Sequence, residues 1–156
     1  MTDYSFIRQD LDDIDRRILR LLIEDARRPY ADIGNQVGLR PSSVHARVRS
    51  LEKRGVIRGY AARTDPAALG FGLAALVSIR QSSGRYWEDL ARAFVDMPEV
   101  EACYSVTGTA SHMLRVRVSD PLALEGLLRK ISSLDAVAST ETMLILTATF
   151  DRQRVE

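Results

Sequence analysis

The chain has 156 residues, of which 46% are hydrophobic and 28% charged, a composition ordinary for one medium or two small globular domains. No apolar run approaches the ~18–20 residues of a membrane-spanning helix, no signal-peptide pattern opens the chain, and the single cysteine, Cys103, excludes an intrachain disulfide and a cysteine-based zinc site. The net charge of +1 conceals an asymmetry, because residues 1–64 hold 13 basic and 9 acidic residues whereas residues 65–156 hold 9 and 12. We therefore expect a cytoplasmic protein without a membrane partner, whose N-terminal part meets a polyanion.

Helical periodicity and turn residues predict three helices in the N-terminal part, over residues 12–25, 30–37 and 41–54. Gly38 provides a C-terminal stop for the second helix. Pro41 suits the first position of the third, because its missing N–H would be unpaired there in any case. A short helix, a tight turn and a second helix form a helix-turn-helix, so we predict a DNA-binding domain over residues 1–63.

The third predicted helix has the two faces that a recognition helix needs. Val44, Val48 and Leu51 form an inward apolar stripe, and small residues followed by basic ones occupy the opposite face. Small side chains let a helix approach base edges, and longer basic ones reach phosphates. A solvated amphipathic helix is the plainer alternative, but the preceding helix and glycine turn favour DNA binding. The residues expected to contact DNA are Arg40, Ser42, Ser43, His45, Ala46, Arg47, Arg49, Lys53 and Arg58.

The spacing of the apolar residues changes after the first domain. We expect a strand over residues 56–63 that leaves the helices as a wing, and a linker over residues 64–70. The remaining segments predict a domain over residues 71–156 with strands at 72–80, 100–106, 111–118 and 137–150 and helices at 86–95 and 121–131. This βαββαβ order is the ferredoxin-like split motif, so the fold class is α+β: a winged helix-turn-helix domain joined to a ferredoxin-like domain.

In such a fold both helices cover one face of the sheet and leave the other face open. Val77 and Leu146 point to one side of their strands, yet Leu76 and Ile145 add apolar surface on the other. An uncovered face this apolar would promote aggregation in a monomer. We therefore expect at least a homodimer, which would also supply two recognition helices for a two-fold DNA site.

Several segments of the sequence resemble the Lrp/AsnC family of regulators, also called feast/famine regulators, and together they extend over nearly the whole chain. The matching motifs are Leu11–Leu19, Gly38–Glu52, Gly55–Tyr60 and Val100–Gly108. Cys103–Val106 and Asp151–Gln153 are similar to regulators of alanine dehydrogenase and related amino-acid metabolism. One departure is Arg40, where many relatives have a serine that caps the helix. Arginine cannot cap, so we expect it to bind a phosphate instead.

The resemblance implies a sequence-specific regulator of amino-acid metabolism genes that assembles as an octamer or another ring of dimers and binds an amino acid between C-terminal domains. The implied effector-binding residues are Tyr104, Val106, Gly108, Thr109, Ala110, Ser111 and His112, together with Leu134, Asp135, Val137 and Thr140 of a neighbouring subunit. His112 is expected to be a partly buried interface residue rather than a ligand contact. Thr109 and Ser111 stand where relatives often carry acidic residues, so the expected effector is a neutral apolar or aromatic amino acid whose ammonium group meets backbone carbonyls, Asp135 or Glu141.

Other classes of function find less support in the sequence. It has no phosphate-binding glycine loop, no metal-spaced ligand cluster and no nucleophile motif, so we expect neither an enzyme nor a cofactor or metal. A nucleoid-like architectural protein that binds DNA with little effector control remains an alternative. A sensor that acts only through protein partners is a third possibility, which requires DNA binding to be absent.

Overall fold

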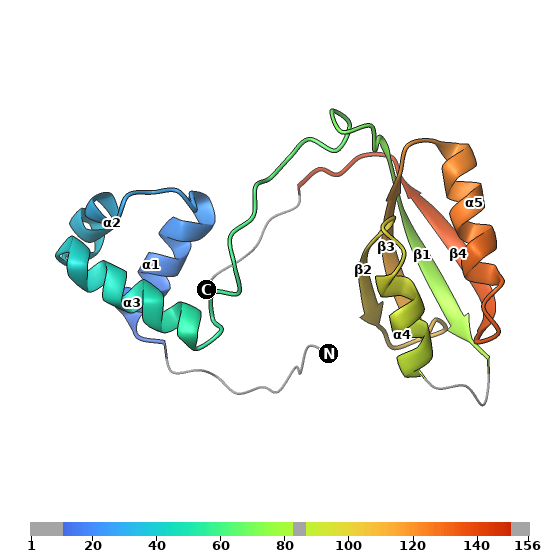
Figure 1. Cartoon of the computed structure of the whole chain (residues 1–156), viewed down its shortest axis with the longest axis horizontal. Coiled ribbons are helices and arrows are strands. Elements are labelled where there is room, and N and C mark those ends of the chain that lie inside the picture. The colour runs from blue at the N-terminus through green and yellow to red at the C-terminus, as the bar shows by residue number, and fades with distance from the viewer. Residues whose placement is uncertain (1–10, 83–86, 151–156) are drawn as a thin grey trace. The chain divides into compact units, whose positions relative to one another are not determined.

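The structure, a computed structural model, describes residues 11–82 and 87–150. It divides into two compact units, one up to Ala62 and one over Arg63–Phe150 (Figure 1). The motif at Asp151–Gln153 and the expected helix start at residue 86 lie outside the described residues.

Three helices make up the N-terminal unit: α1 (Asp13–Glu24), α2 (Tyr30–Val37) and α3 (Pro41–Lys53). These bounds confirm the three predicted helices to within a residue or two. Asp12 caps α1, since its carboxylate accepts a hydrogen bond of 2.7 Å from the Asp15 N–H. The helices enclose a small apolar core whose buried members are Ile18, Leu22, Ile33, Val37, Val44 and Val48.

The turn between α2 and α3 depends on two glycines. Gly38 has φ +74°, a left-handed conformation that ends α2 as expected. Gly34, inside α2, is buried, and its carbonyl accepts a 2.9 Å hydrogen bond from the Leu39 N–H. A Cβ added at Gly34 would lie 2.5 Å from the Leu39 carbonyl oxygen. The chain can therefore turn this closely only because no side chain is present at Gly34.

The prediction of a strand over residues 56–63 is wrong, because those residues form a bend followed by chain without regular secondary structure. Gly55 has φ +71°, and the N–H groups of Val56 and Ile57 bond back to the Leu51 carbonyl at 2.9 and 3.2 Å. A strand requires a neighbour to pair its backbone groups, and the part of the N-terminal unit that the structure describes is entirely helical apart from turns and loops.

The C-terminal unit confirms the βαββαβ order. Its elements are β1 (Leu73–Gln81), α4 (Trp87–Val95), β2 (Val100–Ser105), β3 (His112–Val118), α5 (Pro121–Ser132) and β4 (Val137–Ile145). The sheet order is β2-β3-β1-β4, and every pairing is antiparallel, as in a ferredoxin-like fold. β4 ends at Ile145 rather than at Phe150, because Ile145 pairs with Ala74 and β1 offers only Leu73 beyond it.

Both helices pack on one face of this sheet, as Figure 1 shows for α4 and α5. Residues from β1 and β3 on that face are fully buried, among them Val77 and Leu114. The opposite face has no covering helix among the described residues. Its apolar members, identified by the pairing of the strands, are Ala74, Leu76, Ala102, Tyr104, Met113, Met143 and Ile145.

Candidate nucleic-acid interface and effector site

The outward face of α3 carries most of the residues expected to contact DNA. Six of them are exposed on the side away from the core: Ser42, Ser43, His45, Ala46, Arg49 and Lys53. A shallow concavity on this face is lined by His45, Ala46, Arg49, Ser50 and Lys53. The small Ala46 side chain lies beside two long cations, which is the arrangement that lets a helix approach base edges while cations reach phosphates.

No side chain caps the first turn of α3. Arg40 is the N-cap residue, and its side chain is exposed and makes no capping hydrogen bond. Pro41 follows at the first helical position. The rings of His45 and Tyr30 lie 5.6 Å apart, so α2 supports one side of the outward face.

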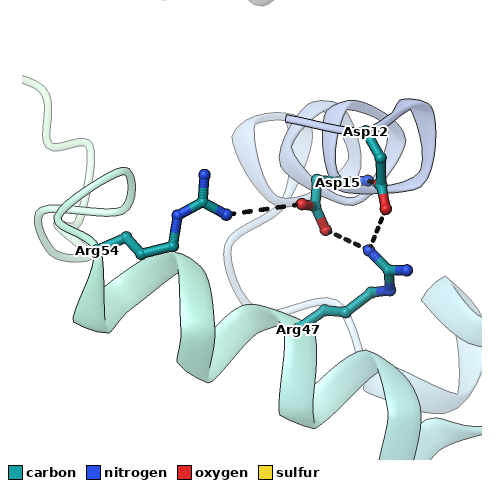
Figure 2. A network of polar contacts seen from close by, with 4 residues as sticks. All are labelled: Asp12, Asp15, Arg47 and Arg54. Atoms are coloured by element: carbon teal, nitrogen blue, oxygen red, sulfur yellow. Dashed lines mark hydrogen bonds and ion pairs between the residues drawn. The ribbon is translucent and has the colours of Figure 1, made fainter. Parts of the chain in front are cut away.

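Arg47 of α3 is directed at Asp12 and Asp15 near the start of α1, as Figure 2 shows. Its Nη1 atom donates hydrogen bonds to Asp12 Oδ2 at 2.6 Å and to Asp15 Oδ1 at 2.8 Å. These carboxylates raise the pKa of Arg47, Asp12 foremost. The Asp15 N–H, and then Arg47, lower the pKa of Asp12. The guanidinium is thus engaged inside the N-terminal unit rather than directed to the outward face.

Arg58 lies exposed in the segment that leaves α3. Two residues later the Tyr60 hydroxyl donates a 2.8 Å hydrogen bond to Glu52 Oε1. Partial burial, followed by the Glu52 carboxylate, raises the pKa of Tyr60 to about 12, so this phenol remains a donor at neutral pH. The exit segment is thereby held against α3.

The two segments expected to bind the effector lie at the same end of the sheet. The β2–β3 loop joins β1 where the Ser111 N–H bonds the Ile79 carbonyl at 2.8 Å. On the other side of β1, Ser82 bonds the Ala136 carbonyl through its N–H at 2.9 Å and the Asp135 carbonyl through its hydroxyl at 2.8 Å. Ser82 was not among the predicted residues, although it connects the 134–140 segment to β1 within one chain.

The expected effector residues do not all face the same way. Gly108, Thr109 and Asp135 are exposed, Val106, Ala110, Ser111 and Thr140 are half-buried, and Tyr104 is 45% exposed on the open face, paired with Met113. Leu134 and Val137 pack against the apolar core between the sheet and its helices. These two side chains contribute to the core of their own unit.

His112 lies on the helix-covered face and is only 5% exposed. Its Nε2 atom is 3.5 Å from Gln81 Oε1, and burial lowers its pKa from the ordinary value of 6.5. His112 is thus more deeply buried than expected, because the C-terminal unit by itself buries it, and its place at an interface stays a prediction.

Gly108 has φ +118°, a conformation that residues with side chains rarely adopt, and nothing lies within 4 Å of the position that a Cβ would take. Its neighbours Thr109 and Ala110 add no charge to the loop. The described residues hold no group of metal-ligating side chains, and none of the helices among them is long and apolar enough to cross a membrane.

Comparison with known proteins decides the family. Residues 11–52 match the model of the AsnC-type helix-turn-helix domain, and residues 74–155 match that of the Lrp/AsnC ligand binding domain. The chain belongs to the Lrp/AsnC family. It is 41% identical to the transcriptional regulator LrpA of Mycobacterium tuberculosis, over 93% of this chain and 97% of that protein. It is also 41% identical to AldR of Mycolicibacterium smegmatis, over 88% and 82% of the two chains.

Solved structures of relatives give the same result for the fold. A feast or famine regulatory protein of M. tuberculosis, solved as a complex with L-methionine, matches with a TM-score of 0.88 at 40% identity, over 94% of this chain and all of that one. Escherichia coli AsnC matches with a TM-score of 0.88 at 29% identity, over 95% and 100% of the chains. These matches confirm the resemblance, and relatives named as transcriptional regulators confirm that this is a regulator and not an enzyme.

Three features of the N-terminal unit were missed by sequence reasoning: the ion pairs of Asp12 and Asp15 with Arg47, the tight approach at Gly34, and the bond that ties Tyr60 to α3. From the sequence, the acidic residues at the start of α1 have no evident partner. Their spacing does carry a signal, because a cap and a residue one turn later present two carboxylates to one neighbouring helix.

Proposed function

We propose that this Lrp/AsnC regulator binds specific DNA sites of amino-acid metabolism genes through the outward face of α3, and that an amino acid bound between C-terminal units modulates the binding. The supporting observation is the exposed face that combines Ala46 with Arg49 and Lys53 beside an open helix start at Arg40. Because this face lies opposite the core of its unit, it can enter a major groove without rearrangement.

The salt dependence of affinity tests the DNA contact. Arg49→Ala is expected to weaken binding by about 10- to 100-fold and to reduce the slope of log K against log[salt] by roughly one, as the loss of a phosphate or base contact does. Arg129→Ala is the matched control, because Arg129 lies on α5 and pairs with Glu125 at 2.6 Å. Fluorescence anisotropy at several salt concentrations measures both variants. An Arg49→Ala variant that behaves like the control would refute the assignment of α3.

We propose a neutral amino acid as effector, because the 106–111 loop carries no charge and relatives have been solved with bound L-methionine. Calorimetry with L-methionine, L-phenylalanine, L-glutamate and L-lysine is expected to detect binding of the neutral pair only. Gly108→Val is expected to abolish binding, since its φ of +118° would be strained by any side chain. Basal DNA binding should persist, because Gly108 lies outside the N-terminal unit. Equal binding in both proteins would place the effector elsewhere.

We propose that a second copy of the chain covers the open sheet face, and that such dimers assemble further into a ring. On this face Leu76 of β1 lies between Met143 of β4 and Arg115 of β3, and Met143 is 44% exposed in the single chain. Burial of this surface against an identical face removes it from water and provides two copies of α3 for a two-fold DNA site.

An architectural DNA-binding protein without effector control is the alternative. It would share the salt dependence expected here but would bind all sequences with similar affinity. The ratio of specific to non-specific affinity separates the two proposals.

A further inference from the structure

We infer that Arg47, with Asp12 and Asp15, is a positioning residue that fixes the recognition helix on α1, and is not itself a DNA contact. This inference rests on the proposed role of α3 and concerns how that helix is held. Figure 2 shows the guanidinium of Arg47 next to both carboxylates. Arg54 lies further along the chain, at the end of α3, and is directed at Asp15.

The position of Arg47 on the helix supports this role. Helical residues advance by about 100° each, so Arg47 lies roughly 60° from the buried Val44 whereas Arg49 lies roughly 140° from it. Arg54, seven residues after Arg47, falls on the same flank, and its Nη1 atom is 4.0 Å from Asp15 Oδ2. The basic residues of α3 therefore form two sets, one that faces outward and one that faces α1.

The burial of Asp15 explains why the helix needs cations on that flank. The residue is only 7% exposed, and one carboxylate oxygen is 2.8 Å from Arg47 Nη1. A carboxylate removed from water is strongly destabilising unless a cation and hydrogen bonds compensate it. Any tilt of α3 away from α1 would separate this carboxylate from its partner, so the ion pair opposes the tilt.

Asp12 links the same guanidinium to the start of α1. Its Oδ2 atom is 2.6 Å from Arg47, while the carboxylate also accepts the Asp15 N–H that begins the helix. One arginine thereby holds the N-terminal cap of α1 and the buried carboxylate one turn later. Since Arg49 and Lys53 project from the same helix, fixing α3 here fixes where those cations lie.

Neutralising the acids distinguishes positioning from direct contact, because the two roles give effects of opposite sign. If Arg47 positions α3, Asp15→Asn is expected to weaken DNA binding by roughly threefold to a hundredfold, although the protein becomes more positive. Asp12→Asn is expected to weaken binding less, because the ion pair at Asp12 is more exposed. If Arg47 were a phosphate contact restrained by the acids, both variants would bind DNA more tightly and with a steeper salt slope.

The experiment measures anisotropy of a DNA fragment selected by the wild-type protein, at several salt concentrations. Asp13→Asn is the matched control: it makes the same charge change on the exposed surface of the first turn of α1, and binding should be unchanged or slightly tighter. Asparagine caps a helix as well as aspartate does, so Asp12→Asn retains the fold and still decides the question if Asp15→Asn unfolds.

Arg47→Ala and Arg49→Ala complete the test. Arg47→Ala should weaken binding with an unchanged salt slope, whereas Arg49→Ala should lower the slope by roughly one. Equal or tighter binding by Asp12→Asn, or a slope lowered by Arg47→Ala, would overturn the positioning role. If Arg49→Ala left affinity and slope unchanged, the assignment of α3 as the DNA-contacting helix would fail instead.

Discussion

Gly34→Ala is expected to destabilise the N-terminal unit, although alanine normally stabilises the interior of a helix. The new Cβ would lie 2.5 Å from the Leu39 carbonyl oxygen, 3.5 Å from its carbon and 3.6 Å from the Pro41 nitrogen. All three atoms belong to the backbone of the α2–α3 turn, so no side chain can rotate away. The turn itself must open, and the 2.9 Å bond from the Leu39 N–H to the Gly34 carbonyl opens with it.

The two opposing terms set the magnitude. Replacing glycine by alanine within a helix stabilises it by about 0.5–1 kcal/mol, and overpacking a closely packed site destabilises it by about 1–3 kcal/mol. The net expectation is a loss of roughly 1 kcal/mol and at most about 2.5 kcal/mol, and each kcal/mol lowers the melting temperature of a unit this small by about 4–8 °C. DNA affinity should fall as well, because the displaced turn carries the start of α3.

Gly126→Ala is the matched control. Gly126 is also inside a helix, α5, but is exposed and has no atom within 4 Å of an added Cβ, so the same substitution should stabilise the C-terminal unit by about 0.5–1 kcal/mol. Hydrogen exchange measured by mass spectrometry follows the opening of each unit separately. A Gly34→Ala protein whose N-terminal unit is as stable as wild type would refute the reasoning from this close approach.

Two further predictions concern the C-terminal unit. Because burial lowers the pKa of His112, the unfolded chain takes up a proton at a higher pH than the folded one, so the free energy of unfolding should be at its full value above about pH 6.5 and should fall below that pH. Denaturant titrations at pH 7.5 and 5.5 should show this loss of stability in the wild-type protein. A His112→Gln variant that kept the full loss would assign it to another group. Leu76→Glu places a charge on the open sheet face and is expected to yield monomers in light scattering, whereas Leu122→Glu, at a side chain 77% exposed on α5, should leave at least a dimer; dimers of Leu76→Glu would contradict the proposed sheet packing.

The helices of the N-terminal unit could be predicted from sequence because their ends are marked locally. Gly38 ends α2 by its left-handed backbone, and Pro41 starts α3 by its fixed φ and missing donor. Neither feature requires knowledge of a distant residue. The ferredoxin-like domain could also be predicted from the sequence, because the order of strands and helices restricts the possible topologies to a few.

The predictions that failed depended on distant partners. Residues 56–63 have the composition of a strand, but none of the residues that the structure describes forms a strand beside them, and β4 stops where β1 ceases to pair with it. The direction of a side chain on a strand also depends on register, since a shift of one residue reverses it. The register places Tyr104 and His112 on opposite faces of the sheet, which the sequence alone does not show.

Arg47 shows the same limit within a helix. Its place in the sequence puts it among the basic residues of α3, but whether it faces DNA or α1 depends on where Asp12 and Asp15 lie after folding. The sequence identifies the helix that should bind DNA, and the packing of α1 separates the cations available for contact from those that hold the helix.

The ratio of specific to non-specific DNA affinity, with and without a neutral amino acid, tests the central proposal most directly. The wild-type protein would select fragments from genomic DNA, and its affinity for the best fragment and for unrelated DNA would be measured at one physiological salt concentration. The proposed function predicts a ratio of about 10³ or more, changed by L-methionine or another neutral amino acid by about 5- to 150-fold. A ratio near one that no amino acid changes would contradict it and would indicate an architectural DNA-binding protein.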